Sequence, residues 1–381
     1  MFTRLYIHIP FCRRKCPYCA FISQESGNDL TSYLEVLLEE MRLAAQESTL
    51  QKPLQSIYFG GGTPSLLEPA HVSRTITEAT KEFGLSERVE ITLEANPGTV
   101  DHERLAGVRS AGVNRLSLGI QSFDDDLLKI LGRIHTAQQA RDAFSAARAA
   151  GFANIGIDLI HALPGQTAEM WRTDLEQALQ LAPEHISVYG LSIEEQTPFA
   201  ERYAGESPLL PDEELAAGMF ETANTLLTAN GYEHYEIANY ARTGFRSGHN
   251  SGYWQRDGYL GLGAGAHSFL RDERYGIRYS NTPDIDKYIA TIQGGKLARL
   301  DATTLSREDA MSEFMFLGLR LADGVEFRIF EQEFGVSPES LYAGVFNGLV
   351  PAGFLERGKD NIRLTQRGML LSNQVFARFL P

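Results

Sequence analysis

Three cysteines could do chemistry in this chain. Cys12, Cys16 and Cys19 are the only cysteines in its 381 residues, and they share one short loop with the spacing C-x3-C-x2-C. Thiolates at such spacing suit a cluster of iron and sulfide, because soft ligands can each hold one iron while bridging sulfides join the irons. In a four-iron cubane, three thiolates leave one iron without a protein ligand. That iron can bind a small molecule.

Other uses of the three thiols stay open from the residues alone. A zinc site completed by His8 or by a remote carboxylate is one, and a chance grouping is another. Zinc sites are usually built from two separated ligand pairs, and this loop offers no second pair. A lone disulfide would leave one thiol over.

Composition limits the class of protein. Lys and Arg number 35 against 49 Asp and Glu, a formal charge of -14, which argues against nonspecific nucleic-acid binding. Free thiols without an even-numbered framework indicate a reducing compartment, so we expect a cytoplasmic protein. The first strand begins by residue 4 and leaves no room for a signal peptide, and no apolar run approaches a membrane span. Peripheral membrane contact stays open.

The first half of the chain alternates between strands and helices. This is the pattern of parallel βαβ units, and six units are too few to close an eight-fold barrel. We therefore predict an α/β fold with an open, partial (β/α)6 barrel. The predicted strands are 5–9, 56–59, 89–94, 115–118, 155–160 and 186–189, with helices at 30–43, 71–83, 102–111, 125–131, 137–149 and 168–180.

Beyond residue 200 the regular alternation stops. We predict a helix at 213–228, a strand at 232–237, helices from about 306, a hairpin over 354–364 and a last helix at 366–379. The expected division is a barrel over 1–240, a connecting region rich in Gly and aromatic residues over 241–305, and a small helical, winged-helix-like domain over 306–381. The acidic balance of this last domain favours a docking or lid role over DNA binding.

Polar and Gly-rich segments follow the predicted strands at their carboxyl ends, the face that carries the active site of such barrels. The stretch 60–64, Gly-Gly-Gly-Thr-Pro, allows a ligand to approach the main chain, or forms only a tight turn. Glu94, Gln121, Arg133 and Asp158 come from separate segments. Together they could meet hydroxyl groups and a carboxylate, although each alone is more often a structural polar residue.

Two further stretches could bind partners. The string 249–254 reads His-Asn-Ser-Gly-Tyr-Trp, in which His249 is either core packing or an axial ligand of haem iron, with the aromatic rings against the porphyrin. Arg13, Arg14 and Lys15 lie between the first two cysteines. They form an exposed loop edge, or a docking patch for an acidic electron donor or for propionates.

The cysteine loop after a first strand resembles the signature of the radical S-adenosylmethionine (SAM) superfamily. The resemblance implies a [4Fe-4S] cluster on Cys12, Cys16 and Cys19. It implies that the methionine amino and carboxylate groups of SAM chelate the open iron, and that an electron cleaves the sulfonium to a 5'-deoxyadenosyl radical.

The HemN-like branch of this superfamily is similar over nearly the whole chain. It implies hydrogen bonds from the Gly stretch to the cofactor, and in that branch two SAM molecules bind, the second of which Gln121, Arg133 and Asp158 could serve. The cofactor-binding residues implied are Tyr6, Tyr18, Gly61, Gly62, Thr63, Glu94, Gln121, Arg133 and Asp158.

Within that branch the chain resembles the haem chaperone HemW family. Oxygen-independent coproporphyrinogen III dehydrogenases carry a fourth cysteine, C-x3-C-x2-C-x-C, after a longer N-terminal segment. Here Phe21 stands at that fourth position, and only eleven residues precede Cys12. The string beginning at His249 matches the H-N-x-x-Y-W motif of the HemW family, which implies His249 as the haem ligand. Ala20 departs from the acidic residue expected after Cys19.

The resemblance implies a haem chaperone that binds the cluster, SAM and haem and passes haem to acceptor haemoproteins. Its partners would include a flavodoxin-type electron donor and a second copy of the chain, and no nucleic acid. The cluster would serve assembly or dimerisation more than turnover. The alternative is a radical enzyme that converts two propionates of coproporphyrinogen III to vinyl groups with loss of carbon dioxide. A nucleic-acid-binding role of the C-terminal domain is a third hypothesis, against which the acidic charge speaks.

Overall fold

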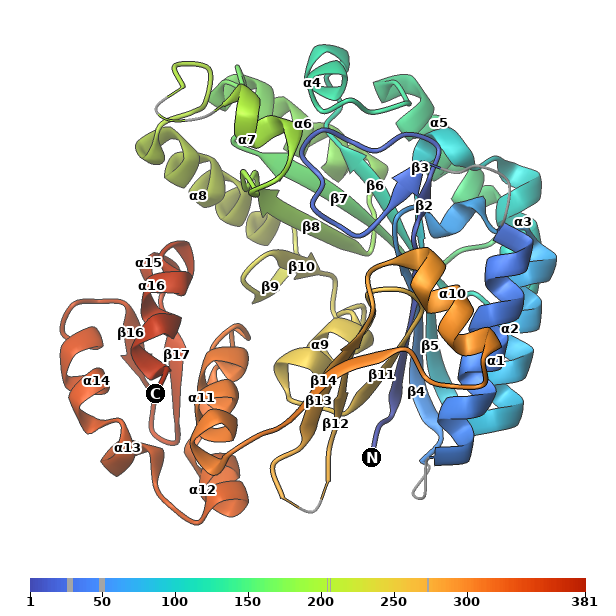
Figure 1. Cartoon of the computed structure of the whole chain (residues 1–381). Helices are drawn as coiled ribbons and strands as arrows, with labels where there is room; N and C mark the ends of the chain where they lie inside the picture. Colours follow the sequence, from blue (N-terminus) through green and yellow to red (C-terminus); the bar gives the residue numbers. More distant parts are fainter. Residues whose placement is uncertain (26–29, 48–51, 204, 206, 273) are drawn as a thin grey trace.

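The computed structural model describes residues 1–25, 30–47, 52–203, 205, 207–272 and 274–381 (Figure 1). Its main feature is a 12-stranded sheet in the order β14-β13-β12-β11-β1-β4-β5-β6-β7-β8-β10-β9. The strands β14 and β9 are the two edges, so the described sheet curves without closing on itself. The prediction of an open α/β barrel is confirmed.

Six parallel strands at the centre of the sheet are those that the sequence predicts. Each pairs in parallel with the next, as expected for strands joined by helical crossovers. The strands are β1 (Arg4–Ile9), β4 (Leu54–Gly61), β5 (Leu85–Ala95), β6 (Arg115–Gln121), β7 (Ile155–His161) and β8 (His185–Gly190).

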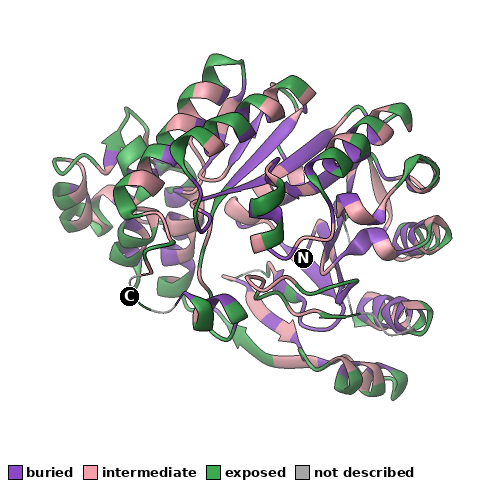
Figure 2. Cartoon of the chain, turned by 90° about the horizontal axis from the view of Figure 1, so that it is seen from above, coloured by how far each residue is buried: buried purple, intermediate pink, exposed green. Residues whose placement is uncertain are grey.

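Helices cover the outer face of these strands. In α1 the buried residues Tyr33, Leu34, Leu37 and Met41 recur at helical spacing and form the apolar stripe that packs on the sheet. Viewed from above, the buried strands lie inside and the exposed sides of the helices face outward (Figure 2). The helices are α1 (Leu30–Glu47), α2 (Pro69–Phe83), α3 (His102–Ser110), α4 (Asp125–Ile130), α5 (Ala137–Ala149), α6 (Ala168–Leu181), α7 (Pro198–Arg202) and α8 (Glu213–Ala229).

Short strands extend the sheet at both edges. β9 (Glu233–Glu236) and β10 (Asn239–Ala241) are antiparallel additions beside β8. At the other edge β11 pairs in parallel with β1, and three antiparallel strands follow it. The sequence reasoning missed these strands, because frequent glycines interrupt the alternation over 258–276. They are β11 (Tyr259–Leu262), β12 (His267–Leu270), β13 (Ile277–Asn281) and β14 (Arg299–Thr304), with α10 (Ile285–Gln293) between the last two.

A small domain with its own apolar core ends the chain. The predicted hairpin is confirmed, since β16 pairs with β17, which also pairs with β15. The prediction of a single last helix over 366–379 is wrong, because this segment is broken at Leu371 into two short helices and a 3-10 turn. Its elements are α11 (Arg307–Gly318), β15 (Val325–Glu326), α12 (Phe327–Phe334), α13 (Pro338–Leu341), α14 (Ala343–Leu349), β16 (Leu355–Arg357), β17 (Asn361–Leu364), α15 (Gln366–Leu370), α16 (Ser372–Phe376) and η3 (Ala377–Phe379).

Ion pairs join this domain to the extended edge of the sheet. Arg256 is buried between Glu313 of α11 (3.4 Å) and Glu333 of α12 (2.8 Å), and Arg278 of β13 also pairs with Glu313.

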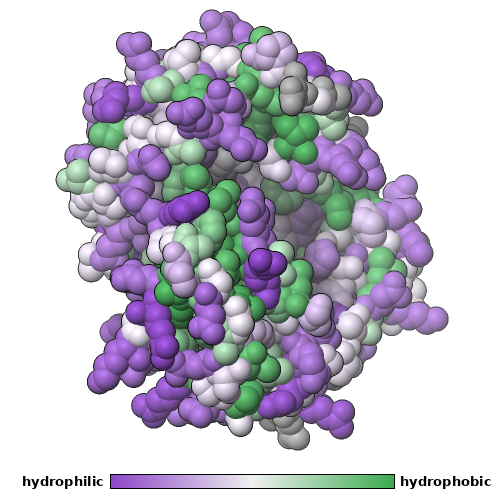
Figure 3. All heavy atoms as spheres, turned by 90° about the vertical axis from the view of Figure 1, so that its left-hand side faces the viewer, coloured by the Kyte–Doolittle hydropathy of each residue, from purple (hydrophilic) through white to green (hydrophobic). Residues whose placement is uncertain are grey.

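On the face seen in Figure 3, hydrophobic patches lie among hydrophilic residues. No helix in the described ranges has the length and apolar character of a membrane span.

Candidate functional site

A cavity of about 620 Å³ lies at the carboxyl ends of the parallel strands. Cys12, Cys16 and Cys19 line it, as the barrel polarity predicts. Most of the predicted cofactor residues line it too, although they come from six separate segments. These are Tyr18, Gly61, Gly62, Thr63, Glu94, Gln121, Arg133 and Asp158, whereas Tyr6 and His249 are not among the lining residues.

The Gly stretch after β4 holds the start of the cysteine loop. Thr63 donates its backbone N–H to the carbonyl of Phe11 at 2.8 Å. A Cβ on Gly62 would lie 2.7 Å from that carbonyl and 3.0 Å from the Cys12 sulfur, so only glycine fits here. The stretch therefore positions a cysteine as well as lining the cavity.

The second half of the loop rests on α7 and on the turn before α5. Phe199 of α7 donates its N–H to the carbonyl of Pro17 at 3.0 Å, and its ring lies 6.0 Å from that of Tyr18. Gly132 adopts a φ of +69°, and a Cβ there would lie 2.6 Å from the Pro17 ring. These contacts fix the segment between Cys16 and Cys19.

The donor set fits an iron–sulfur cluster better than a single zinc ion. All three thiols are free and face one cavity. Within the described ranges, no three His, Cys, Asp or Glu side chains are arranged around one metal ion. His8 does not complete a zinc site, because its Nδ1 contacts the Tyr6 hydroxyl at 3.1 Å and its Nε2 contacts the Ile22 carbonyl at 2.8 Å.

Two carboxylates, those of Glu94 and Asp158, line the same cavity. Glu94 accepts hydrogen bonds from the Tyr58 hydroxyl at 2.7 Å and from the Gly61 N–H at 3.3 Å. Burial raises the pKa of Glu94 to about 7, and Tyr58 partly opposes this shift. Asp158 accepts from the Ser117 hydroxyl at 3.3 Å, and burial raises its pKa as well. Both acids can accept hydrogen bonds from hydroxyl or amino groups of a ligand.

Gln121 and Arg133 keep polar atoms without a partner in the described structure. The Oε1 of Gln121 and the Nε of Arg133 are buried and unpaired. Gln121 also has a φ of +72°, a strained value for a residue with a side chain. Unpaired polar atoms beside a cavity fit a bound polar ligand, because leaving them unpaired is costly.

Tyr6 lies in the barrel interior beside the cavity. Its hydroxyl contacts His8, and burial raises its pKa, with the charge of Glu94 adding to the shift. A contact between Tyr6 and the cofactor stays a prediction.

His249 lies elsewhere, on the helix α9 (Gly248–Trp254) at the amino ends of the strands, which we call the barrel floor. Only 1% of it is exposed. Its Nδ1 contacts the Ser56 hydroxyl at 2.8 Å and its Nε2 contacts the Tyr253 hydroxyl at 2.7 Å. Burial lowers the pKa of His249 well below its usual value. With both nitrogens engaged, His249 has no free lone pair for haem iron in this conformation, so haem ligation stays a prediction.

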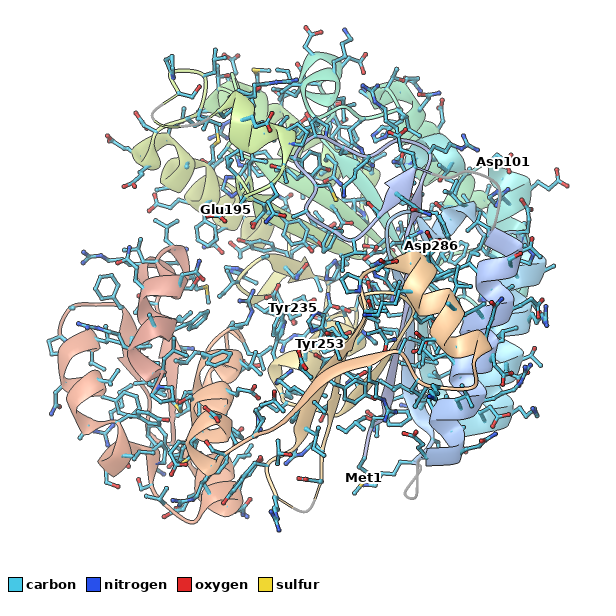
Figure 4. The ribbon with its side chains drawn as sticks, in the orientation of Figure 1. Met1, Asp101, Glu195, Tyr235, Tyr253 and Asp286 are labelled. Carbon is cyan, nitrogen blue, oxygen red and sulfur yellow. The ribbon has the colours of Figure 1, made fainter. Side chains whose placement is uncertain are left out.

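Contacts from two strands clamp α9 in place. Glu90 of β5 accepts from the N–H groups of Gly248 and His249, both at 2.9 Å. Arg4 of β1 donates to the Gly248 carbonyl at 2.7 Å and pairs with Asp257 at 2.6 Å. The labelled Tyr253 of α9 is near the centre of the view in Figure 4. The string 249–254 therefore fills the barrel floor.

The sequence reasoning missed Ser117 and Tyr189, which also line the cavity. In β6 the residues Ser117, Gly119 and Gln121 alternate on one face and all line the cavity, so period-two spacing back from Gln121 could have found Ser117. Tyr189 stands one residue before the end of β8, a position that the barrel polarity marks in the same way.

Comparison with known proteins agrees with this arrangement. The Radical SAM superfamily matches residues 6–178, and the HemN C-terminal domain matches residues 305–371. The crystal structure of coproporphyrinogen III oxidase (HemN) from Escherichia coli superposes with a TM-score of 0.86 over 99% of this chain and 90% of that one. At 23% identity it shows a shared fold.

Curated relatives match over their whole length. A protein of Lactococcus lactis named heme chaperone HemW is 40% identical over 98% of this chain and 96% of its own. A protein of the same name from Haemophilus influenzae is 39% identical over 99% of this chain and 97% of its own. The predicted resemblance is confirmed, and the chain belongs to the haem chaperone HemW family within the radical SAM superfamily.

Proposed function

We propose that this protein is a haem chaperone that binds a [4Fe-4S] cluster through Cys12, Cys16 and Cys19, and SAM in the adjoining cavity. The observation that carries the proposal is the meeting of these thiols with eight of the predicted cofactor residues around one cavity of about 620 Å³. Glu94 and Asp158 would accept hydrogen bonds from the cofactor, and Arg133 would attract its carboxylate. When bound, the cluster supplies an open iron and a path for one electron.

Haem binding and transfer to acceptor haemoproteins are supported by the name of the full-length relatives. Ligation by one ring nitrogen of His249 requires that the hydrogen bond of that nitrogen, to Ser56 or to Tyr253, breaks. Because only 1% of His249 is exposed, α9 must also move to admit haem. The proposal of His249 as the ligand therefore includes a change of conformation on haem binding.

The proposal has three finer parts. Arg13, Arg14 and Lys15 are exposed beside the cysteines and would attract an acidic electron donor such as a flavodoxin. A second copy of the chain and a cytoplasmic location complete the proposal, the latter from the free thiols.

The alternative function, decarboxylation of coproporphyrinogen III, is distinguished by turnover. A fourth cysteine would stand at residue 21 in that class of enzyme, whereas here the Phe21 side chain is 66% exposed at the rim of the cavity. We propose that the protein lacks this activity.

One anaerobic experiment tests both functions. The reconstituted protein is assayed for protoporphyrinogen formation with SAM and a one-electron reductant. In parallel, haem is titrated by absorption, and haem-loaded protein is mixed with an apo-haemoprotein whose spectrum reports transfer. We expect a haem spectrum, transfer and no turnover. Sustained turnover would contradict the proposal, and so would an absorption spectrum that added protein leaves unchanged.

A further inference from the structure

Arg133 is the cation built most closely onto the cysteine loop. Its Nη1 donates toward the Cys16 sulfur at 3.6 Å, and its Nη2 donates to the Gly119 carbonyl of β6 at 2.7 Å. The loop cations Arg13, Arg14 and Lys15 are instead exposed. Among the described hydrogen bonds, Arg133 is thus the arginine whose side chain contacts a cysteine sulfur directly.

The turn that carries Arg133 is rigid. Arg133 donates its backbone N–H to the Leu128 carbonyl at 2.9 Å, which closes the end of α4. The preceding Gly132 packs against Pro17, between the second and third cysteines. The backbone next to the guanidinium is therefore hydrogen-bonded to α4 and packed against the cysteine loop beside Cys16.

A half-buried cation beside a ligating sulfur changes the energy of adding an electron. Reduction of a cluster adds one electron and, with no proton taken up, makes its net charge more negative by one. A cation stabilises the reduced state, and hydrogen bonds to cluster sulfurs are known to set reduction potentials. The effect is large at low dielectric constant, whereas charges in water are screened.

We propose that Arg133 raises the reduction potential of the cluster through its contact with the Cys16 sulfur, apart from any contact that it makes with SAM. The electron comes from a low-potential one-electron donor. The inference rests on the proposed cluster on Cys12, Cys16 and Cys19. It assigns to Arg133 a role on the bound cluster that operates before SAM binds.

The test is a redox titration of reconstituted protein without SAM, with dithionite as reductant and the electron paramagnetic resonance signal of the reduced cluster as readout. We expect Arg133→Gln to make reduction about tenfold less favourable, a shift of about 59 mV to lower potential. Arg133→Lys keeps the positive charge and loses the forked contact, so we expect it to make reduction about threefold less favourable. Arg172→Gln is the matched control, because Arg172 is an exposed cation of α6 outside the cavity lining, and it should change the equilibrium less than twofold.

Iron and sulfide contents of each protein separate the two hypotheses. If the unchanged protein binds no cluster, the proposed function fails first. A native potential in Arg133→Gln at full iron content overturns the inference. If Arg133→Gln binds no cluster, Arg133→Lys decides, and a native potential there overturns the inference. Titration of the same variants with SAM shows whether Arg133 acts only on the cofactor. Loss of SAM affinity with an unchanged potential would also count against the inference.

Discussion

The two ends of the barrel are built from similar residues and do different things. At the carboxyl ends of the strands, Tyr, acidic and Arg side chains surround a cavity, and Gln121 and Arg133 keep unpaired polar atoms. At the amino ends, the floor also contains Tyr, Glu and Arg side chains, but His249 has both nitrogens engaged and Glu90 caps α9. One end is open to a ligand, and the other is filled by the chain itself.

This difference shows why residue type alone does not identify a binding site. A histidine near a Tyr and a Trp suits haem chemically, yet in this fold its lone pairs are used inside the protein. The cysteines are suited to metal and remain uncommitted. A polar group that already has hydrogen-bond partners within the fold has a structural role, whereas a group without such partners is available to bind a ligand.

The largest effect is expected from the cysteines. Cys16→Ala should reduce bound iron and sulfide to less than about a tenth, because the remaining two thiolates cannot hold a cubane. The fold should persist, since no disulfide is lost. Iron and sulfide analysis with circular dichroism makes the measurement, and Gln24→Ala on the same loop is the control. Full iron content in Cys16→Ala would contradict the proposed cluster site at this cavity.

The next largest effect should come from a single methyl group in the floor. A Cβ on Gly252 would lie 1.6 Å from the Arg4 Nε, so Gly252→Ala must displace Arg4 from its ion pair with Asp257. We expect a loss of about 3–5 kcal/mol in the free energy of unfolding, measured in urea. Gly218→Ala in α8 is the matched control. Nothing lies within 4 Å of its Cβ, and it should gain about 1 kcal/mol from helix propensity. Equal urea midpoints of unfolding for the two variants would contradict a stabilising role of the Arg4 contacts in the floor.

Substitution of His249 sharpens the comparison further. His249→Ala should cost about 2–4 kcal/mol, because it leaves a cavity and two buried hydroxyls without a partner. Ser56→Ala and Tyr253→Phe each remove one hydrogen bond and should cost about 1 kcal/mol. If His249 ligates haem, only His249→Ala abolishes the haem spectrum. A similar loss of haem in all three variants would assign the effect to the structure of the floor.

The smallest effect is the pH dependence of the cavity. Glu94 has a pKa of about 7, so its ionised fraction rises from about a tenth at pH 6 to about nine tenths at pH 8. Because the carboxylate accepts hydrogen bonds from the ligand, SAM affinity should rise about tenfold over this range. Calorimetry on cluster-loaded protein measures it. Glu94→Gln removes this contribution, so identical pH profiles for the two proteins would contradict the role of Glu94.

Much of the barrel could be predicted from the sequence. The six parallel strands carry short apolar segments, such as Leu5, Ile7 and Ile9 of β1, and a helix follows each strand, with apolar residues at helical spacing in α1. The edge strands β11 to β14 could not be recognised, because each has only four to six residues and glycines lie within β11 and in the turns between β11 and β13. β11 joins the sheet by pairing with β1, a contact between residues some 250 positions apart in sequence that local pattern does not record. The strands β12 to β14 then pair one after another from β11.

The sequence by itself determined that three cysteines share one loop, the polarity of the barrel and most of the predicted residues that line its mouth. These follow from spacing within one loop and from the rule that parallel strands end at the same edge. Only the tertiary structure decided the state of His249, because its partners Ser56 and Glu90 are brought to it from β4 and β5. A hydrogen bond that spans nearly 200 residues of chain leaves no mark in local sequence, yet it decides whether a lone pair is free.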